Sequence, residues 1–321
     1  MKIIVGIFIF CIILFLYLHV TFQLHTSNDL DVYEIEATSK ERLEEVCDIR
    51  QPVLFDYVNE TVMRDINLRQ LTKRYSAFDV NMRSVDETDD DSLYSPVPLR
   101  SVAKLIGMDS NKKYFSENNS VFLTDTGGIK SMSYHDEFIR PYMVSNCNYD
   151  VMFGSDGVTT PMRYEVNYRN YFYVTEGAVD IRLAAPKNSK YLMEHSDYMN
   201  YEFRSPINPW DVQDTHALDF DKVKCIDVHL TPGKMIYIPA YWWYSIKFGK
   251  GATVACFRYR TYMNNISIVP RICMYFLQQQ NLLHDGRTSK YGREVNIVAN
   301  SSDESKDDTP NAVNEEKNDD T

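Results

Sequence analysis

The sequence lacks an excess of positive charge. Its 321 residues include 34 Lys and Arg against 45 Asp and Glu, and the formal net charge is −11 at pH 7. Binding the phosphates of a nucleic acid requires a basic surface, so the composition argues against nucleic acid as a partner. The acidity is concentrated beyond Asn296, where eight acidic residues accompany two lysines. This tail carries −6 and the rest of the chain −5.

Paired cysteines are also missing. The six cysteines are widely scattered, with no CxxC pair and no zinc-like spacing. Cys11 lies in the apolar N-terminal run, which leaves an odd number elsewhere and argues against a full disulfide framework. Because free cysteine commonly packs as a small hydrophobic side chain, we expect most of the six to be buried thiols.

One long hydrophobic run is present, at the N-terminus. Ile3–Phe22 carries no formal charge and is long enough to cross a hydrocarbon core of about 30 Å. A cleaved signal peptide has a shorter apolar core of about 7–15 residues, followed by small residues at the cut site. Thr21–Leu24 offers no such site. The run therefore favours an uncleaved transmembrane anchor at 1–24, with a linker at 25–37.

The charges flanking this run predict an orientation. Lys2 precedes the run, whereas four acidic residues follow it before the next lysine, Lys40. The positive-inside rule counts mainly Lys and Arg. We therefore expect a single-pass membrane protein with a cytosolic N-terminus and the main domain on the opposite side.

The middle of the chain has the pattern of a β protein. Beyond Tyr142, short apolar runs alternate with Gly, Asn, Asp and Pro, as in an all-β core. Ser267–Leu283 has apolar residues on more than one face, which predicts a docked or paired C-terminal helix. The polar, acidic residues 291–321 are predicted to be disordered. Further predicted elements are helices at 39–46, 61–75 and 99–106 and strands at 53–55, 79–83 and 120–123.

The most informative stretch is Leu230–Phe248, LTPGKMIYIPAYWWYSIKF. Pro232 and Gly233 suit the central positions of a type II turn. A short apolar strand follows, then a corner that begins at Pro239 and a second strand that opens on four aromatic residues. A strand pair with a bend between its members is typical of a barrel or jelly roll.

This stretch resembles the JmjC-type cupin-like family of iron- and 2-oxoglutarate-dependent oxygenases, whose corresponding segment runs L-x-P-G-D-x-x-x-I-P-x-x-W-W-H. Thr160–Pro161, Asn170 and Gly177–Pro186 match a second part of the family pattern. The resemblance implies a mainly β fold, a double-stranded β-helix or jelly roll with flanking helices. It places the domain at 38–290, its barrel core at about 142–262 and its C-terminal helix at 267–283. Similar membrane-anchored proteins occur among large DNA viruses.

The residues expected to hold iron do not match the family. Such enzymes bind Fe(II) through two imidazoles and one carboxylate. Alignment on Thr160–Pro161 places Arg163 and Glu165 at the family's HxD positions, whereas alignment on Asn170 places Tyr164 and Val166 there. Two further positions also depart from the pattern. Tyr244 stands where the family has its last histidine, and Val179 stands where it has the lysine that pairs with 2-oxoglutarate.

We therefore predict a polar cluster of Arg163, Glu165 and Tyr244 where iron would have been, with Glu165 neutralising Arg163. Asn170 and Val179 complete this candidate pocket. The aromatic run offers either a ligand-stacking wall or core packing for Trp242 and Trp243. Core packing is favoured, because aromatic side chains supply large buried area.

Three functions follow as hypotheses. The first is a membrane-anchored cupin-like binding or structural module, a pseudoenzyme with no metal or cofactor and an unknown protein or small-molecule ligand. The second is an Fe(II)- and 2-oxoglutarate-dependent protein hydroxylase with non-standard ligands. The third is a non-metal enzyme or small-ligand binder working through Arg163, Glu165 and Tyr244. In related oxygenases the C-terminal helical region often forms a dimer, so the resemblance also implies a homodimer through 267–283.

Overall fold

The computed structural model describes residues 2–36, 39–85, 94–198 and 201–280. The chain divides into two units, Met1–Arg271 and Ile272–Thr321, and the fold below is that of the first. The predicted acidic tail at 291–321 and the end of the predicted helix at 281–283 lie outside the described residues. The helical residues 269–280 continue from the first unit into the second.

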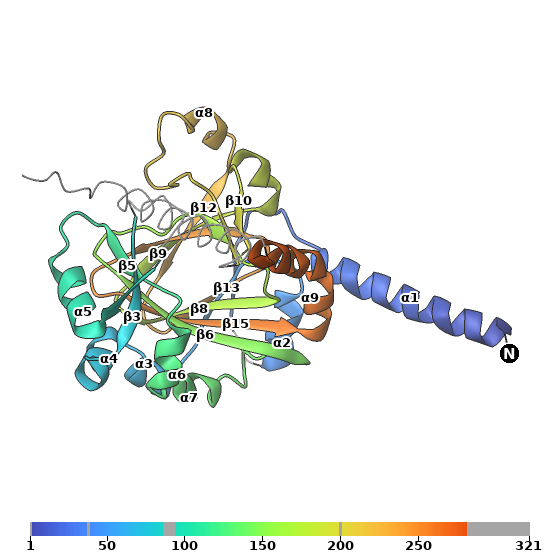
Figure 1. The fold of residues 1–321 in the computed structure, drawn as a ribbon, viewed down its shortest axis with the longest axis horizontal. Coiled ribbons are helices and arrows are strands. Elements are labelled where there is room, and N and C mark those ends of the chain that lie inside the picture. Colours follow the sequence, from blue (N-terminus) through green and yellow to red (C-terminus); the bar gives the residue numbers. More distant parts are fainter. Residues whose placement is uncertain (1, 37–38, 86–93, 199–200, 281–321) are drawn as a thin grey trace, which may run out of the picture. The chain divides into compact units, whose positions relative to one another are not determined.

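Two sheets dominate the described residues (Figure 1). The larger has the strand order β1-β2-β13-β8-β15-β6-β5-β3-β4, and the smaller has the order β10-β11-β7-β14-β9-β12. The larger sheet contains β1 (Tyr33–Ile35), β2 (Val53–Asp56), β3 (Asp79–Ser84), β4 (Ser95–Pro98), β5 (Tyr114–Ser116), β6 (Val144–Gly154), β8 (Arg169–Glu176), β13 (Lys234–Ile238) and β15 (Thr253–Thr261). The smaller contains β7 (Arg163–Tyr164), β9 (Val179–Ala184), β10 (His195–Asp197), β11 (Glu202–Arg204), β12 (Cys225–Leu230) and β14 (Trp243–Phe248). This architecture confirms the predicted mainly β fold and agrees with a jelly roll.

The middle of the larger sheet is buried on both faces, as β8 shows. Successive side chains of a strand point to opposite faces, and β8 follows this rule. Tyr171 and Tyr173 join one apolar core, which they share with the helices before the barrel. Phe172 and Val174 join the other, which lies between the two sheets. The barrel interior is therefore filled by apolar side chains over most of its length.

Helices cover the outer face of the larger sheet. Figure 1 shows α3 to α7 gathered on one side of the barrel strands. The helices of the first unit are α1 (Lys2–Leu24), α2 (Lys40–Cys47), α3 (Glu60–Asp65), α4 (Leu68–Tyr75), α5 (Leu99–Met108), α6 (Ser120–Asp125), α7 (Gly128–Ser133), α8 (Ala217–Phe220) and α9 (Tyr262–Ser267), with a 3-10 helix η1 (Pro186–Tyr191).

Two local predictions are wrong. The strand expected at 120–123 is the helix α6, because a short apolar run can suit either period. The single helix expected at 61–75 is split in two, since Asn67 leaves helical geometry at φ −138° and its side chain accepts a hydrogen bond from the Gln70 backbone to cap α4.

The cysteine prediction holds only in part. All six thiols are free, but only Cys47 and Cys256 are buried. Cys147 and Cys225 are half-buried, and Cys11 and Cys273 are exposed.

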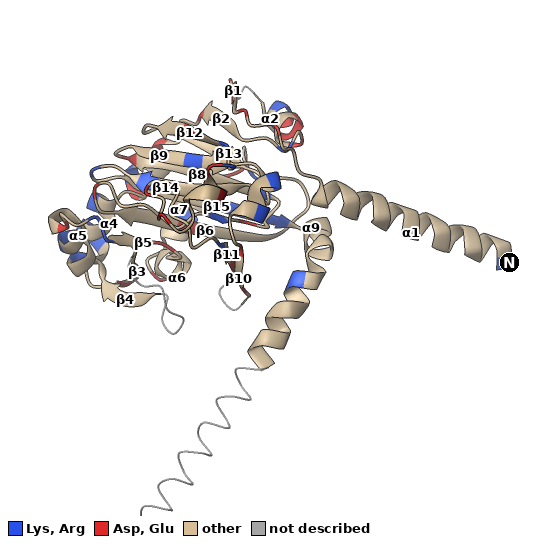
Figure 2. Cartoon of the chain, turned by 90° about the horizontal axis from the view of Figure 1, so that it is seen from above, with Lys and Arg blue, Asp and Glu red and all other residues tan. Residues whose placement is uncertain are grey.

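Helix α1 matches the predicted N-terminal run. It is long and apolar enough to cross a membrane, and none of its most apolar window is buried in the protein. A signal sequence gives the same pattern. In Figure 2 the ribbon of α1 has the colour of uncharged residues, because its sequence holds no Lys, Arg, Asp or Glu beyond its first residue, Lys2.

Candidate functional site

The stretch from Thr231 to Phe248 carries the chain from one sheet to the other. The Lys234 N–H donates to the Thr231 carbonyl at 3.0 Å, and Gly233 has a φ of +90°, as the predicted turn requires. The following strand β13 lies in the larger sheet and β14 in the smaller. At the corner between them, the Tyr241 N–H donates to the Glu165 carbonyl at 2.8 Å. The corner thereby holds β14 beside β7 and its following loop.

The strand register shows which of the candidate residues from the two alignments lie beside Tyr244. Tyr244 on β14 is the direct cross-strand partner of Arg163 on β7. Tyr164 points to the other face, where its ring stacks on Phe203 at a centroid distance of 5.1 Å. The structure therefore places Arg163 and Glu165, the pair named by the alignment on Thr160–Pro161, beside Tyr244.

Arg163 is paired with a residue that the sequence did not single out. Its Nη1 donates to Glu117 Oε1 at 2.8 Å, and its Nη2 contacts the other carboxylate oxygen of Glu117. Both side chains are buried, at 5% and 1% exposure. Burial raises the pKa of the Glu117 carboxyl, but Arg163 and Arg83 outweigh it and lower the pKa to about 2. The prediction that Glu165 neutralises Arg163 is wrong.

Glu165 instead joins Tyr244 and Arg258. The Tyr244 hydroxyl donates to Glu165 Oε1 at 3.1 Å, and Arg258 Nε lies 3.4 Å from the same oxygen. The Arg163 guanidinium lies over the Tyr244 ring, 5.5 Å from its centroid. Burial raises the pKa of the Tyr244 phenol, against a lowering by Arg163. The structure thus brings the three predicted residues together, with Tyr244 between the other two.

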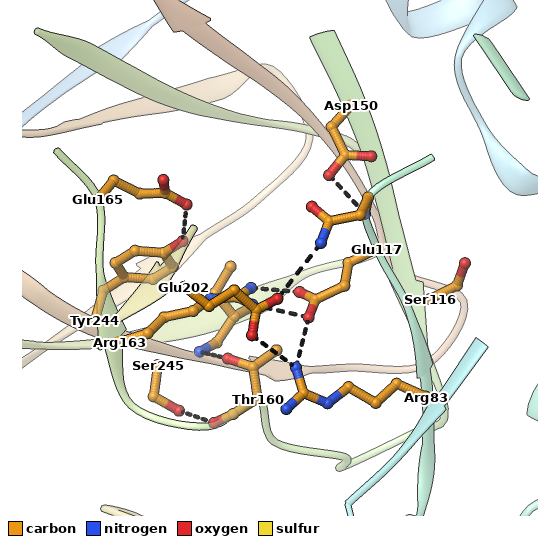
Figure 3. Close-up of polar contacts among 12 residues, drawn as sticks. Arg83, Ser116, Glu117, Asp150, Thr160, Arg163, Glu165, Glu202, Tyr244 and Ser245 are labelled. Atoms are coloured by element: carbon orange, nitrogen blue, oxygen red, sulfur yellow. Dashed lines mark hydrogen bonds and ion pairs between the residues drawn. The ribbon is translucent and has the colours of Figure 1, made fainter. Parts of the chain in front are cut away.

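A buried arginine–glutamate network lies next to this group and shares Arg163 with it. The network consists of Arg83, Glu117, Arg163 and Glu202. Arg83 Nη1 lies 3.3 Å from Glu117 Oε1 and 3.3 Å from Glu202 Oε2. Figure 3 shows both arginines converging on Glu117, with Glu202 beside them. These residues come from β3, β7, β11 and the turn after β5, so no local motif unites them. The only available signal was a charged residue within or next to short strands.

Of the two other predicted pocket residues, Asn170 lies next to the group, as the cross-strand partner of Arg258, and Val179 lies elsewhere. Val179 pairs with Phe248 while Tyr244 pairs with Leu183, four residues further along the strand, or about 13 Å. Val179 is buried in the apolar core between the sheets. Asn170 is buried nearer the group, where its Nδ2 donates to the Ile238 carbonyl at 3.2 Å. Val179 does not belong to the pocket.

The paired tryptophans are core residues. Trp242 and Trp243 both have 0% exposure. The Trp242 indole N–H donates to the Arg50 carbonyl at 3.2 Å, and that of Trp243 donates to the Ser189 hydroxyl at 2.8 Å. Both polar tips are used within the fold, so the suggested ligand-stacking wall is wrong for these two residues.

A cavity of about 210 Å³ opens beside the polar group. Its lining is polar and charged rather than apolar. It consists of Arg163, Arg258 and Arg260, Glu165 and Glu202, Asn118, Asn146, Asn148 and Asn167, and Tyr164, Tyr201 and Phe203.

These residues do not fit Fe(II). Two imidazoles and a carboxylate are required, whereas the matching positions hold a guanidinium, a carboxylate and a phenol. Arg163 is a permanent cation within the group and would repel a metal ion. Within the described ranges, no three His, Cys, Asp or Glu side chains are grouped as a metal site.

Comparison with known proteins identifies the family. The cupin-like domain family matches residues 32–263, which is well over half of the chain. No curated protein shows significant similarity. The match spans both sheets and the helices between them, including the segment from Thr160 to Tyr244 that builds the polar group. The chain therefore belongs to the cupin-like domain family.

Proposed function

We propose that this chain is a membrane-tethered cupin-like binding module whose barrel mouth accepts a small polar ligand and does not carry out iron-dependent oxidation. The observation that carries the proposal is the buried pairing of Arg163 with Glu117. This ion pair occupies the position at which the family resemblance predicts the first iron ligand.

The energetics support this proposal. Breaking a buried ion pair by withdrawing one partner is strongly destabilising, because it leaves an uncompensated charge. Metal at this position would have to coexist with Arg163 or displace it from Glu117. Glu165 is also committed, since it accepts hydrogen bonds from Tyr244 and Asn167.

The membrane tether in this proposal is α1. Its length and composition suit a membrane span. The lack of a small-residue cut site at Thr21–Leu24 supports a span that stays uncleaved, and its single flanking lysine, Lys2, supports a cytosolic N-terminus. A homodimer through the C-terminal helix stays a prediction from the family resemblance.

The test is a titration of the full chain, purified in detergent, with Mn(II) as a redox-silent substitute for Fe(II). Metal content after desalting and the midpoint of thermal unfolding are measured with and without 2-oxoglutarate. Any ligand that binds the native state raises its stability by mass action. We expect neither stoichiometric metal nor a shift that depends on 2-oxoglutarate.

The opposite result would establish the hydroxylase hypothesis. Stoichiometric metal together with a stabilisation that requires 2-oxoglutarate would refute the proposal. The variant Glu165→Gln then locates the metal, because Glu165 is the only carboxylate at the three positions aligned with iron ligands. Loss of metal from this variant would place it at the Arg163, Glu165 and Tyr244 group.

A further inference from the structure

We infer that the cavity binds its ligand through an oxyanion, a carboxylate or phosphate group, held by Arg260 next to Arg258. This inference rests on the proposed function, since it names the ligand class of the same cavity. It does not involve the position expected for 2-oxoglutarate, where Val179 is buried in the apolar core.

Of the three arginines that line the cavity, Arg260 is the one for which the described residues supply no counter-ion. Arg163 pairs with Glu117, Arg83 pairs with Glu202, and Arg258 contacts Asp150 and Glu165. Among the described residues, Arg260 has no carboxylate partner, although it lines the cavity. A guanidinium presents parallel N–H groups that match the two oxygens of a carboxylate or phosphate.

Arg260 is also held in place. Its Nε donates to Asn167 Oδ1 at 2.6 Å, and its guanidinium lies 4.9 Å from the centroid of the Tyr201 ring. Asn167 in turn donates to Glu165 Oε2 at 3.2 Å. These contacts use Nε and one face of the guanidinium, so its terminal N–H groups stay available for a ligand.

Arg258 adds a second, more deeply buried donor. It lies two residues before Arg260 on β15, on the same face of the strand. Its side chain is only 9% exposed, and its Nε lies 3.4 Å from Glu165 Oε1 without hydrogen-bond geometry. A buried N–H whose hydrogen bond is not made costs about 1–3 kcal/mol. A ligand oxygen near this group would offset that penalty.

The rim of the cavity supplies neutral groups for the rest of the ligand. Asn146 and Asn148 are exposed on one face of β6 and line the cavity. Neither carboxamide hydrogen-bonds to another described side chain or backbone group. A carboxamide both donates and accepts, so a ligand with an amide or hydroxyl group beside its oxyanion fits this rim.

The experiment compares acetate, inorganic phosphate and N-acetylglycine as probes of the full chain in detergent at fixed ionic strength. Binding is measured by calorimetry for the wild type and for the variants Arg260→Gln, Arg260→Lys and Arg69→Gln. Arg69 is the matched control, because it is exposed and pairs with Glu176 outside the cavity. We expect Arg260→Gln to weaken binding about tenfold or more, Arg260→Lys to retain part of it and Arg69→Gln to leave it unchanged.

The probes distinguish the ligand groups. Tighter binding of acetate than of phosphate identifies a carboxylate ligand, and the reverse identifies a phosphate. N-acetylglycine should bind more tightly than acetate, and Asn146→Ala should remove that gain. Binding of no probe, or binding that Arg260→Gln leaves intact while its thermal unfolding is normal, would overturn the inference.

This outcome is separate from that of the metal titration. Stoichiometric Mn(II) with 2-oxoglutarate would refute the proposed function while Arg260-dependent oxyanion binding still stood. Absence of both metal and oxyanion binding would leave the proposed lack of iron chemistry standing and refute the ligand assignment.

Discussion

At the scale of single residues, Glu117 balances the buried charge of the barrel. It is 1% exposed and lies within 3.3 Å of Arg83 and 2.8 Å of Arg163. Replacing it by Gln keeps the shape but leaves two arginines without this carboxylate. We expect Glu117→Gln to lower the free energy of unfolding by about 3–5 kcal/mol.

Urea denaturation followed by tryptophan fluorescence measures this loss, since Trp242 and Trp243 are fully buried in the same domain. Glu137→Gln is the control, because Glu137 is exposed and its side chain makes no contact with the network. Equal stability of Glu117→Gln and the wild type would contradict the assigned charge balance.

The same carboxylate predicts a dependence on pH. The arginines hold the pKa of Glu117 at about 2, below its usual value of 4.5. A lowered pKa in the folded state contributes stability that is fully present above pH 4.5 and is lost as the pH falls toward 2. The shift corresponds to about 3 kcal/mol. We expect the stability gap between wild type and Glu117→Gln to narrow over this range. A gap that is constant from pH 5 to pH 3 would show that Glu117 does not titrate in this way.

At the scale of elements, alanine substitutions at two glycines with left-handed backbones distinguish the cost of backbone strain from the cost of a steric clash. Gly177 joins β8 to β9 at φ +71°, and an added Cβ would lie 2.6 Å from the Ala252 Cα. Gly233 has φ +90°, with no heavy atom within 4 Å of such a Cβ. Left-handed backbone alone costs about 1–2 kcal/mol, and overpacking adds about 1–3 kcal/mol.

Gly233→Ala should therefore lower the free energy of unfolding only by the cost of the left-handed backbone, about 1–2 kcal/mol. Gly177→Ala should lower it by that cost and by the cost of overpacking, about 1–3 kcal/mol more. Chemical denaturation of the two variants measures the difference. If both lose the same stability, the turn at Gly177 does not approach the β14–β15 connection closely enough to exclude a methyl group.

At the scale of the whole molecule, retention or cleavage of α1 determines whether the domain is tethered to a membrane. If it is an uncleaved span, the full chain should stay with membranes during alkaline extraction, and a chain that begins after Leu24 should be released. The N-terminal peptide of the membrane-bound protein, identified by its mass, should include Lys2. A mature protein that starts near residue 25 would identify α1 as a signal sequence instead.

The polar site could be predicted from the sequence only in part. The Thr160–Pro161 pair and the segment around Tyr244 were sufficient to expect Arg163, Glu165 and Tyr244 together. The sequence could not predict that Arg163 pairs with Glu117, because β5 and β7 meet only through the two-sheet arrangement. Val179 was misplaced for a related reason, whereas the favoured core packing of Trp242 and Trp243 is confirmed by their complete burial. A family pattern gives positions along strands but not which side chains the core absorbs.

By itself, the sequence determined the strand-rich fold, the corner that begins at Pro239 and the apolar N-terminal run, and it predicted the departure from an iron-ligand set. These properties follow from local composition, turn chemistry and side-chain type, which act over a few residues. Only the tertiary structure decided the strand register, the Arg83, Glu117, Arg163 and Glu202 network and the place of Arg260 in the cavity, where the described residues give it no carboxylate partner. Ion pairs and cavities depend on distances between segments remote in the chain, and those distances exist only once the two sheets have packed.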